Sequence, residues 1–187
     1  MRSSLRTTLA AIATLTTLAI GAEAQHAQHA STLTADLRED IEQVEKKMLD
    51  LVRAIPEDKF GWRPGAGVRS VGEVVMHVAA DNYLIPAAIG FPADPATGIK
   101  GDDYKTAVAF EKRPANKAAA IAELEKSFAF VKKSLDASSG KLAQPVSMFG
   151  MNLTSQKAWI MATTHLHEHL GQLIAYARSN GIAPPWS

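Results

Sequence analysis

The chain has 187 residues, with 20 Lys and Arg against 19 Asp and Glu, six His, and an apolar fraction of 47%. This length predicts one domain, and the apolar fraction is sufficient for a hydrophobic core. A formal net charge of +1 gives no basic field that would attract nucleic acid or an anionic membrane. The lack of Cys excludes disulfides, thiolate nucleophiles, Cys-ligated zinc, iron–sulfur clusters and a lipoprotein anchor.

The first 24 residues have the pattern of a secretory signal peptide. Arg2 and Arg6 precede an uncharged stretch, residues 7–21, that is rich in Leu, Ala, Ile and Thr, and Ala-Glu-Ala at 22–24 supplies the small residues that a signal peptidase requires. The stretch is shorter than the roughly 20 residues of a membrane-spanning helix. We therefore expect cleavage after Ala24, export to the periplasm or the medium, and no stable membrane anchor. An uncleaved anchor is the alternative.

A short polar leader, residues 25–32, follows the signal peptide. It has no apolar periodicity and is predicted to be flexible. Its two His, His26 and His29, could instead capture a metal ion loosely. The folded domain is expected over residues 33–187.

Apolar residues spaced alternately four and three apart predict a first helix from about Thr34 to Ala54. They are Leu37, Ile41, Val44, Met48, Leu51 and Ile55. Pro56 ends this helix, and residues 57–69 are predicted to form a loop because they contain several Gly and Pro.

Ser70 and Glu73 have the spacing of a capping box and predict the start of a second helix. Its apolar side holds Val71, Val74, Val75 and Val78. We expect the helix to bend or end near Pro86, because proline removes a helical hydrogen bond. The following residues, 90–113, are predicted to be an irregular connection.

Two further helices are predicted in the second half of the chain. One runs from about Asn116 to Ala137, and the last, capped by Thr154 or Ser155, runs to Ser179. Between them, residues 141–152 are expected to include a short extended piece around 146–149. Four amphipathic helices without a convincing strand predict an all-α fold, a four-helix bundle with long loops. The long connections allow a topology other than up-down-up-down.

The candidate chemistry of the domain lies in its histidines. At 100° per residue, His165 and His169 are about 40° apart on one helix, whereas His167 points about 160 to 200° away from them. His77 borders the apolar side of the second helix. One His from one helix and a His pair from another is how bundles build an internal metal site. Spacing alone leaves the alternative that these His lie at the core edge, bonded to a carbonyl or to water.

Three imidazole ligands would leave coordination positions open for water or substrate. Nitrogen ligands suit zinc, nickel, copper or ferrous iron and disfavour calcium and magnesium, which prefer oxygen. Glu73 and Asp81, each one turn from His77, could orient its ring, or they could lie solvated at the surface.

Three segments of the chain resemble the DinB-like (DinB/YfiT-type) superfamily. They are Trp62-Arg63-Pro64, the helix start Ser-Val-Gly-Glu-Val-Val-Met-His-Val-Ala at 70–79, and His-Leu-His-Glu-His-Leu-Gly-Gln-Leu at 165–173. The resemblance covers about residues 33–186. Members are four-helix bundles that bind a divalent metal through a His of the second helix and a His-x-x-x-His pair of the last helix. The resemblance implies that His77, His165 and His169 are the ligands and that His167 is not.

The resemblance implies more than one activity. Some relatives are thiol-dependent S-transferases or isomerases that use bacillithiol or mycothiol, others resemble metal-dependent hydrolases, and many have no known activity. This chain departs from the usual cytoplasmic member by its secretory signal. Because low-molecular-weight thiols are cytoplasmic reagents, export disfavours the thiol-dependent transferase. The sequence offers no Ser-His-Asp or Cys-His set for covalent catalysis.

We therefore expect an exported protein that binds one divalent metal ion and hydrolyses a small substrate. The alternative is a non-catalytic periplasmic bundle that binds a metal ion or a small ligand, and a thiol-dependent S-transferase is the third interpretation. The partner is a small molecule rather than nucleic acid, and a homodimer is left open. Glu73, Asp81 and Tyr83 are the candidate general bases.

Overall fold

The structure is a computed structural model that describes residues 32–187. The predicted signal peptide, residues 1–24, and the leader with His26 and His29 lie outside these residues, apart from residue 32, which is already helical. Export and cleavage after Ala24 therefore stay predictions.

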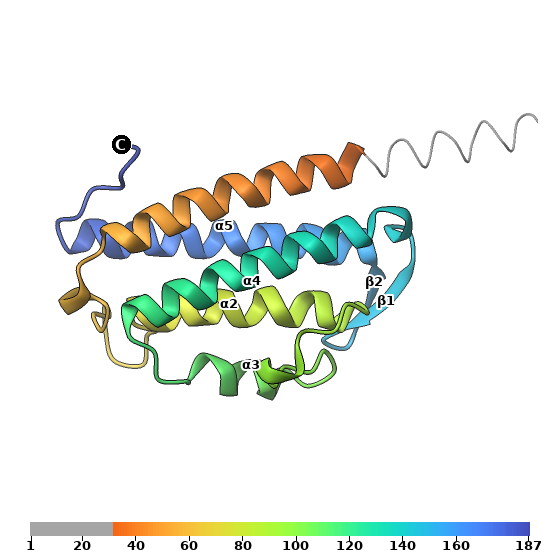
Figure 1. Ribbon diagram of the computed structural model, residues 1–187, viewed down its shortest axis with the longest axis horizontal. Helices are drawn as coiled ribbons and strands as arrows, with labels where there is room; N and C mark the ends of the chain where they lie inside the picture. Colours follow the sequence, from red (N-terminus) through yellow and green to blue (C-terminus); the bar gives the residue numbers. More distant parts are fainter. Residues whose placement is uncertain (1–31) are drawn as a thin grey trace, which may run out of the picture.

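Four long helices form the bundle, as the sequence predicts (Figure 1). They are the described part of the first helix, residues 32–54, and α2 (Val71–Ala88), α4 (Lys117–Ala137) and α5 (Ser155–Ser179). The capping box that begins α2 is present, because Ser70 and Glu73 each bond the backbone of the other. Pro86 lies inside α2, and the helix ends two residues later.

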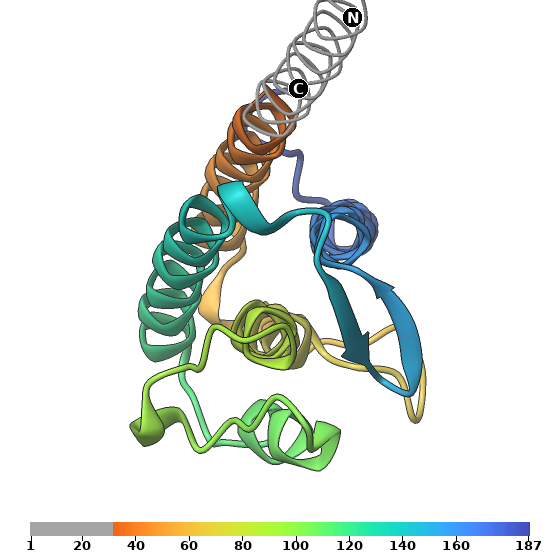
Figure 2. The same cartoon turned by 90° about the vertical axis from the view of Figure 1, so that its right-hand side faces the viewer.

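The order of the helices around the bundle differs from the order along the chain. Seen end on, the first helix and α2 lie at opposite corners, with α4 and α5 between them (Figure 2). The chain runs in one direction through α2 and α4 and in the other through the first helix and α5 (Figure 1). The bundle is therefore not a simple up-down-up-down one, as the long connections allowed.

An additional helix corrects the prediction of an irregular connection over residues 90–113. This helix, α3 (Tyr104–Glu111), begins after Asp103, whose side chain accepts a hydrogen bond from the backbone N–H of Lys105. It buries only Ala107 and Phe110. Two buried positions within eight residues are too few to give a recognisable apolar period, and for this reason the sequence did not indicate the helix.

The position of α3 encloses α2 on its outer side (Figure 2). Every residue of α2 from Val74 to Pro86 is buried, including its polar residues His77, Asp81 and Asn82. We expected a single apolar side on this helix. Because α3 covers the side that a four-helix bundle would leave in solvent, His77 lies inside the protein against Glu111, whereas Asn82 faces α4 and donates to Ser127.

A two-stranded hairpin connects α4 to α5. Its strands, β1 (Pro145–Met148) and β2 (Met151–Thr154), pair antiparallel. The extended piece expected around 146–149 corresponds to β1. Phe149 and Gly150 form the turn, with φ values of 53° and 76°, the left-handed conformation that a tight two-residue hairpin requires at both positions.

The first helix is held to its neighbours by charged pairs and by the apolar core. Its ion pairs to α4 are Arg38 with Asp136, Glu45 with Lys132, and Arg53 with Glu125. Between the helices, the largest fully buried side chains include Ile41, Met48, Leu84, Phe128, Trp159 and Leu166. None of the described helices is long and apolar enough to span a bilayer.

Gly101 allows the connection after α2 to press against the end of that helix. A Cβ atom at this position would lie 2.3 Å from the carbonyl carbon and oxygen of Ala87, which are backbone atoms and cannot turn away.

We expect Gly101→Ala to lower the free energy of unfolding by about 1–3 kcal/mol, the usual cost of overpacking. Urea denaturation of the variant and of the unaltered protein measures this free energy. Gly140→Ala is the matched control, because a Cβ there meets nothing within 4 Å. Equal stability of the two variants would contradict the close approach.

Candidate metal centre

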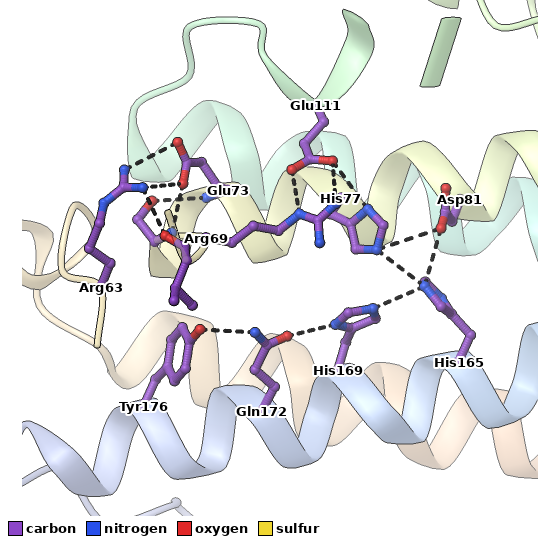
Figure 3. A network of polar contacts seen from close by, with 12 residues as sticks. Arg63, Arg69, Glu73, His77, Asp81, Glu111, His165, His169, Gln172 and Tyr176 are labelled. Atoms are coloured by element: carbon purple, nitrogen blue, oxygen red, sulfur yellow. Dashed lines mark hydrogen bonds and ion pairs between the residues drawn. The ribbon is translucent and has the colours of Figure 1, made fainter. Parts of the chain in front are cut away.

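The rings of His77, His165 and His169 converge between α2 and α5 (Figure 3). The Nε2 atom of His165 lies 3.3 Å from Nε2 of His77 and 2.9 Å from Nε2 of His169. One ligand atom from each of the three residues lies within 4.8 Å of the others. His77 and His169 are buried, and His165 is partly exposed. These positions match the interpretation of the sequence, in which the three residues form one cluster.

His167 lies on another face of α5. Its Nε2 atom is 3.0 Å from the carboxylate of Asp40 on the first helix, and both side chains are about half exposed. The predicted helical register, which places His167 on a different face from His165 and His169, is therefore correct.

Two of the three clustered rings have their tautomer fixed by a neighbour. Nδ1 of His77 lies 3.2 Å from Oε2 of Glu111, and Nδ1 of His169 lies 2.7 Å from Oε1 of Gln172. Both partners are acceptors, so each Nδ1 carries the hydrogen. The amide nitrogen of Gln172 donates to the hydroxyl of Tyr176 at 2.9 Å, which turns Oε1 toward His169. The Nε2 atom of His169 consequently carries a lone pair, and the contact of Nδ1 with Glu111 turns Nε2 of His77 toward the cluster.

Burial and hydrogen bonds shift the pKa of His169 and of Glu111, the partner of His77, in ways that favour a neutral ring and an ionised carboxylate. Burial lowers the pKa of His169 to about 4, helped by repulsion from His165, so this ring is uncharged at neutral pH. Burial raises the pKa of Glu111, but hydrogen bonds from His77 and Arg69 outweigh it and bring the pKa to about 2. A neutral imidazole that donates through Nδ1 to a fixed acceptor is the form in which His binds a metal ion through Nε2.

The spacing of the nitrogen atoms fits a shared cation. Two ligand atoms, each about 2.1 Å from one ion, lie about 3.0 Å apart at a right angle and about 3.4 Å apart at a tetrahedral angle. The separations of 2.9 and 3.3 Å are close to these values. The donor set thus fits a divalent transition-metal ion.

Of the three candidate general bases, the structure brings one to the cluster. Oδ2 of Asp81 lies 3.1 Å from Nε2 of His165 and 3.6 Å from Nε2 of His77. Glu73 instead binds the backbone N–H of Ser70 and the guanidinium of Arg63. The hydroxyl of Tyr83 donates to Glu123 on α4, and burial together with this bond raises the pKa of Tyr83. The alternative that Glu73 orients His77 is therefore wrong, and Glu111 has that position.

Sequence reasoning missed Glu111, Arg69 and Gln172. Glu111 forms a two-point ion pair with Arg69 in addition to its contact with His77. Nothing in the sequence indicated Glu111, because it lies on the helix that was not predicted. Gln172 could have been found, since a residue three positions after His169 lies beside it on a helix.

A cavity of about 610 Å³ lies beside the cluster. Glu111 and Gln172, the partners of two of the rings, are part of its wall. Three cations also line it: Arg63, Arg69 and Lys112. The first two are paired with Glu73 and Glu111, whereas Lys112 has no ion-pair partner within residues 32–187.

The family follows from a comparison of sequences. The profile of the DinB superfamily matches residues 40–173, a range that contains all three clustered His. The chain belongs to the DinB superfamily. No curated protein matches its sequence significantly.

Solved structures of other DinB-like proteins share the fold. A DinB-like protein from Bacillus cereus superposes with a TM-score of 0.62 at 14% identity, over 76% of this chain and 89% of that one. YfiT from Bacillus subtilis, described as "a probable metal-dependent hydrolase with an unusual four-helix bundle topology", gives a TM-score of 0.59 at 14% identity, over 80% and 89%. A mycothiol-dependent maleylpyruvate isomerase gives 0.59 at 12% identity, over 75% and 60%. At these identities the similarity establishes the fold and no activity.

The hydrogen bonds of the site predict the tautomers of two rings in the metal-free protein. At neutral pH, long-range ¹H–¹⁵N NMR spectra should show His77 and His169 protonated at Nδ1, because Glu111 and Gln172 accept there. Gln172→Leu should remove the preference of His169 alone, and Glu111→Gln should weaken that of His77 alone. A proton on Nε2 of both rings in the unaltered protein would contradict this arrangement.

Proposed function

We propose that this DinB-superfamily protein binds one divalent transition-metal ion through His77, His165 and His169. The observation that carries the proposal is the convergence of three imidazole rings, two of which are held at Nδ1 by Glu111 and Gln172 so that Nε2 faces inward. The superfamily adds support, because YfiT, a probable metal-dependent hydrolase, has the same fold. Imidazole ligands suit zinc, nickel, copper and ferrous iron.

We infer further that the centre hydrolyses a small substrate. A divalent ion in such a site polarises a carbonyl or phosphoryl oxygen and lowers the pKa of water, so that no protein nucleophile is required. The cavity beside the cluster, about 610 Å³, has the size of a small-molecule site. Because Lys112 has no ion-pair partner among the described residues, it is available to bind an acidic group of the substrate.

The residues of the chain have separate tasks in this proposal. Glu111 and Gln172 hold the rings of His77 and His169 with Nε2 facing inward. Arg69 neutralises Glu111 and keeps its carboxylate in place at the wall of the cavity. Asp81 is the candidate proton acceptor that reaches the cluster.

We also propose that the protein acts outside the cytoplasm, in the periplasm or the medium. The charged start, the apolar stretch and Ala-Glu-Ala at 22–24 support this. Export also disfavours a thiol-dependent transfer, although a mycothiol-dependent isomerase shares the fold. A non-catalytic metal- or ligand-binding bundle is the alternative, supported by the fact that only one of the three candidate bases reaches the cluster.

Metal binding should depend on three of the four His of the described domain. His77→Ala, His165→Ala and His169→Ala should each lower the affinity for zinc or nickel by at least about 100-fold, because a lost ligand costs more than a lost outer partner. Titration calorimetry should give one ion per chain for the unaltered protein. His167→Ala is the matched control and should bind as the unaltered protein does, since its ring contacts Asp40 instead. Equal losses for His167 and His169 would contradict the proposal.

Hydrolysis should require the metal ion. Activity on esters, amides or phosphoesters, each tested with and without an acidic group, should disappear on chelation and return with one equivalent of metal. Circular dichroism must show that the metal-free protein is folded, because a metal ion can also stabilise the fold. One bound ion per chain without hydrolysis of any of these classes would favour the non-catalytic alternative.

Processing can be read from the N-terminus of the protein isolated from its native host. Mass spectrometry should find Gln25 as the first residue, either free or as pyroglutamate. A chain that begins at Met1 would contradict export through a cleaved signal.

A further inference from the structure

Asp81 is a buried carboxylate that the proposed set of three His ligands leaves unexplained. It lies one turn after His77 on α2 and is 9% exposed. Its Oδ2 atom lies 3.1 Å from Nε2 of His165 and 3.6 Å from Nε2 of His77. Its other oxygen, Oδ1, is buried without a hydrogen-bond partner. The carboxylate therefore points at the place where the imidazole nitrogens converge (Figure 3).

No Lys or Arg of the described chain forms an ion pair with this carboxylate, whose contacts are the rings of His165 and His77. Arg69 is close enough for an electrostatic attraction to Asp81, but its guanidinium is bound to Glu111. Arg69 and Glu111 balance each other's charge, so Arg69 does not offset the charge of Asp81. An uncompensated buried carboxylate is costly, and a cation is the usual compensation.

We propose that Asp81 is a fourth protein ligand rather than a free proton acceptor, so that the site offers three imidazoles and one carboxylate to the metal ion. This inference rests on the proposed binding of an ion by the three His. The distances from Oδ2 to the imidazole nitrogens, 3.1 and 3.6 Å, resemble those between the nitrogens themselves, 2.9 and 3.3 Å. Oδ2 of Asp81 thus has the spacing of a shared ligand with two of the three imidazole nitrogens, those of His165 and His77.

A carboxylate ligand changes which metal ions the site prefers. Carboxylate oxygen suits harder ions such as manganous and ferrous ions, whereas imidazole alone favours copper, nickel and zinc. The carboxylate also supplies a negative charge that three neutral imidazoles do not. Asp81 should therefore narrow the difference in affinity between manganese and zinc.

The test compares Asp81→Asn with Asp40→Asn in the purified protein. Asp40 is the matched control, because its carboxylate also lies 3.0 Å from an imidazole Nε2, that of His167, but on the exposed side of α5. Affinities for Mn²⁺ and Zn²⁺ are measured by competition titration. The visible absorption of the Co²⁺-loaded protein reports changes among the ligands.

Asp81→Asn should still bind one ion per chain through the three His, with an affinity for Mn²⁺ lowered more than 10-fold and an affinity for Zn²⁺ lowered less. Its Co²⁺ spectrum should differ from that of the unaltered protein, and Asp40→Asn should match the unaltered protein in both measurements. The metal-free Asp81→Asn protein should melt at or above the temperature of the metal-free unaltered protein, because the variant replaces a buried carboxylate whose Oδ1 has no hydrogen-bond partner.

Three results would overturn the inference: unchanged affinities and spectrum in Asp81→Asn, equal changes in Asp40→Asn, or a metal-free Asp81→Asn protein that is unfolded or melts lower. The last result would mean that Asp81 has a structural role. Asp81→Glu provides a second measurement, since it keeps the charge and should retain more Mn²⁺ affinity than Asp81→Asn. The proposed metal binding itself, and not only the role of Asp81, would be contradicted by two other results. These are an unaltered protein that binds no ion and a His169→Ala variant whose affinity equals that of the unaltered protein.

Discussion

The burial of α2 on every side is the constraint on which the site depends. A helix of a four-helix bundle ordinarily keeps one face in solvent, where polar side chains cost nothing. Here α3 covers that face, so His77 and Asp81 must find partners inside the protein. His77 has one in Glu111 and faces the His pair of α5, and each of these contacts comes from a different helix.

This constraint also explains why the site is assembled from residues far apart in the sequence. The parallel course of α2 and α4 requires the chain to return along the bundle between them, and α3 lies on that return (Figure 1). The return places Glu111 against His77, with Arg69 from the loop before α2 bound to the same carboxylate. The topology therefore supplies both the cover of α2 and the acceptor that orients its histidine.

The sequence was sufficient to predict the helices that have an apolar period or an N-terminal cap. The first helix, α4 and α5 are visible as apolar stripes, α2 as a capping box, and the separation of His167 from His165 and His169 as a helical angle. The rest depends on contacts between distant segments. The eight residues of α3 bury only Ala107 and Phe110, which gives no period to recognise. The packing of α3 decides that Glu111, and not Glu73, contacts His77. The spacing of residues within α2 carries no information about this contact.

The distance along the chain between the two halves of the cluster has a consequence for folding. His77 and His165 are 88 residues apart, and the described segment between them contains α3, α4 and the hairpin. An ion held by both would act as a cross-link that closes a long loop, and restricting the unfolded chain in this way favours the folded state more for long loops than for short ones. A protein without Cys has no disulfide with which to do this. Such a cross-link between α2 and α5 would slow the opening of the bundle at its centre, which would protect the chain from proteases if the protein is exported as we propose.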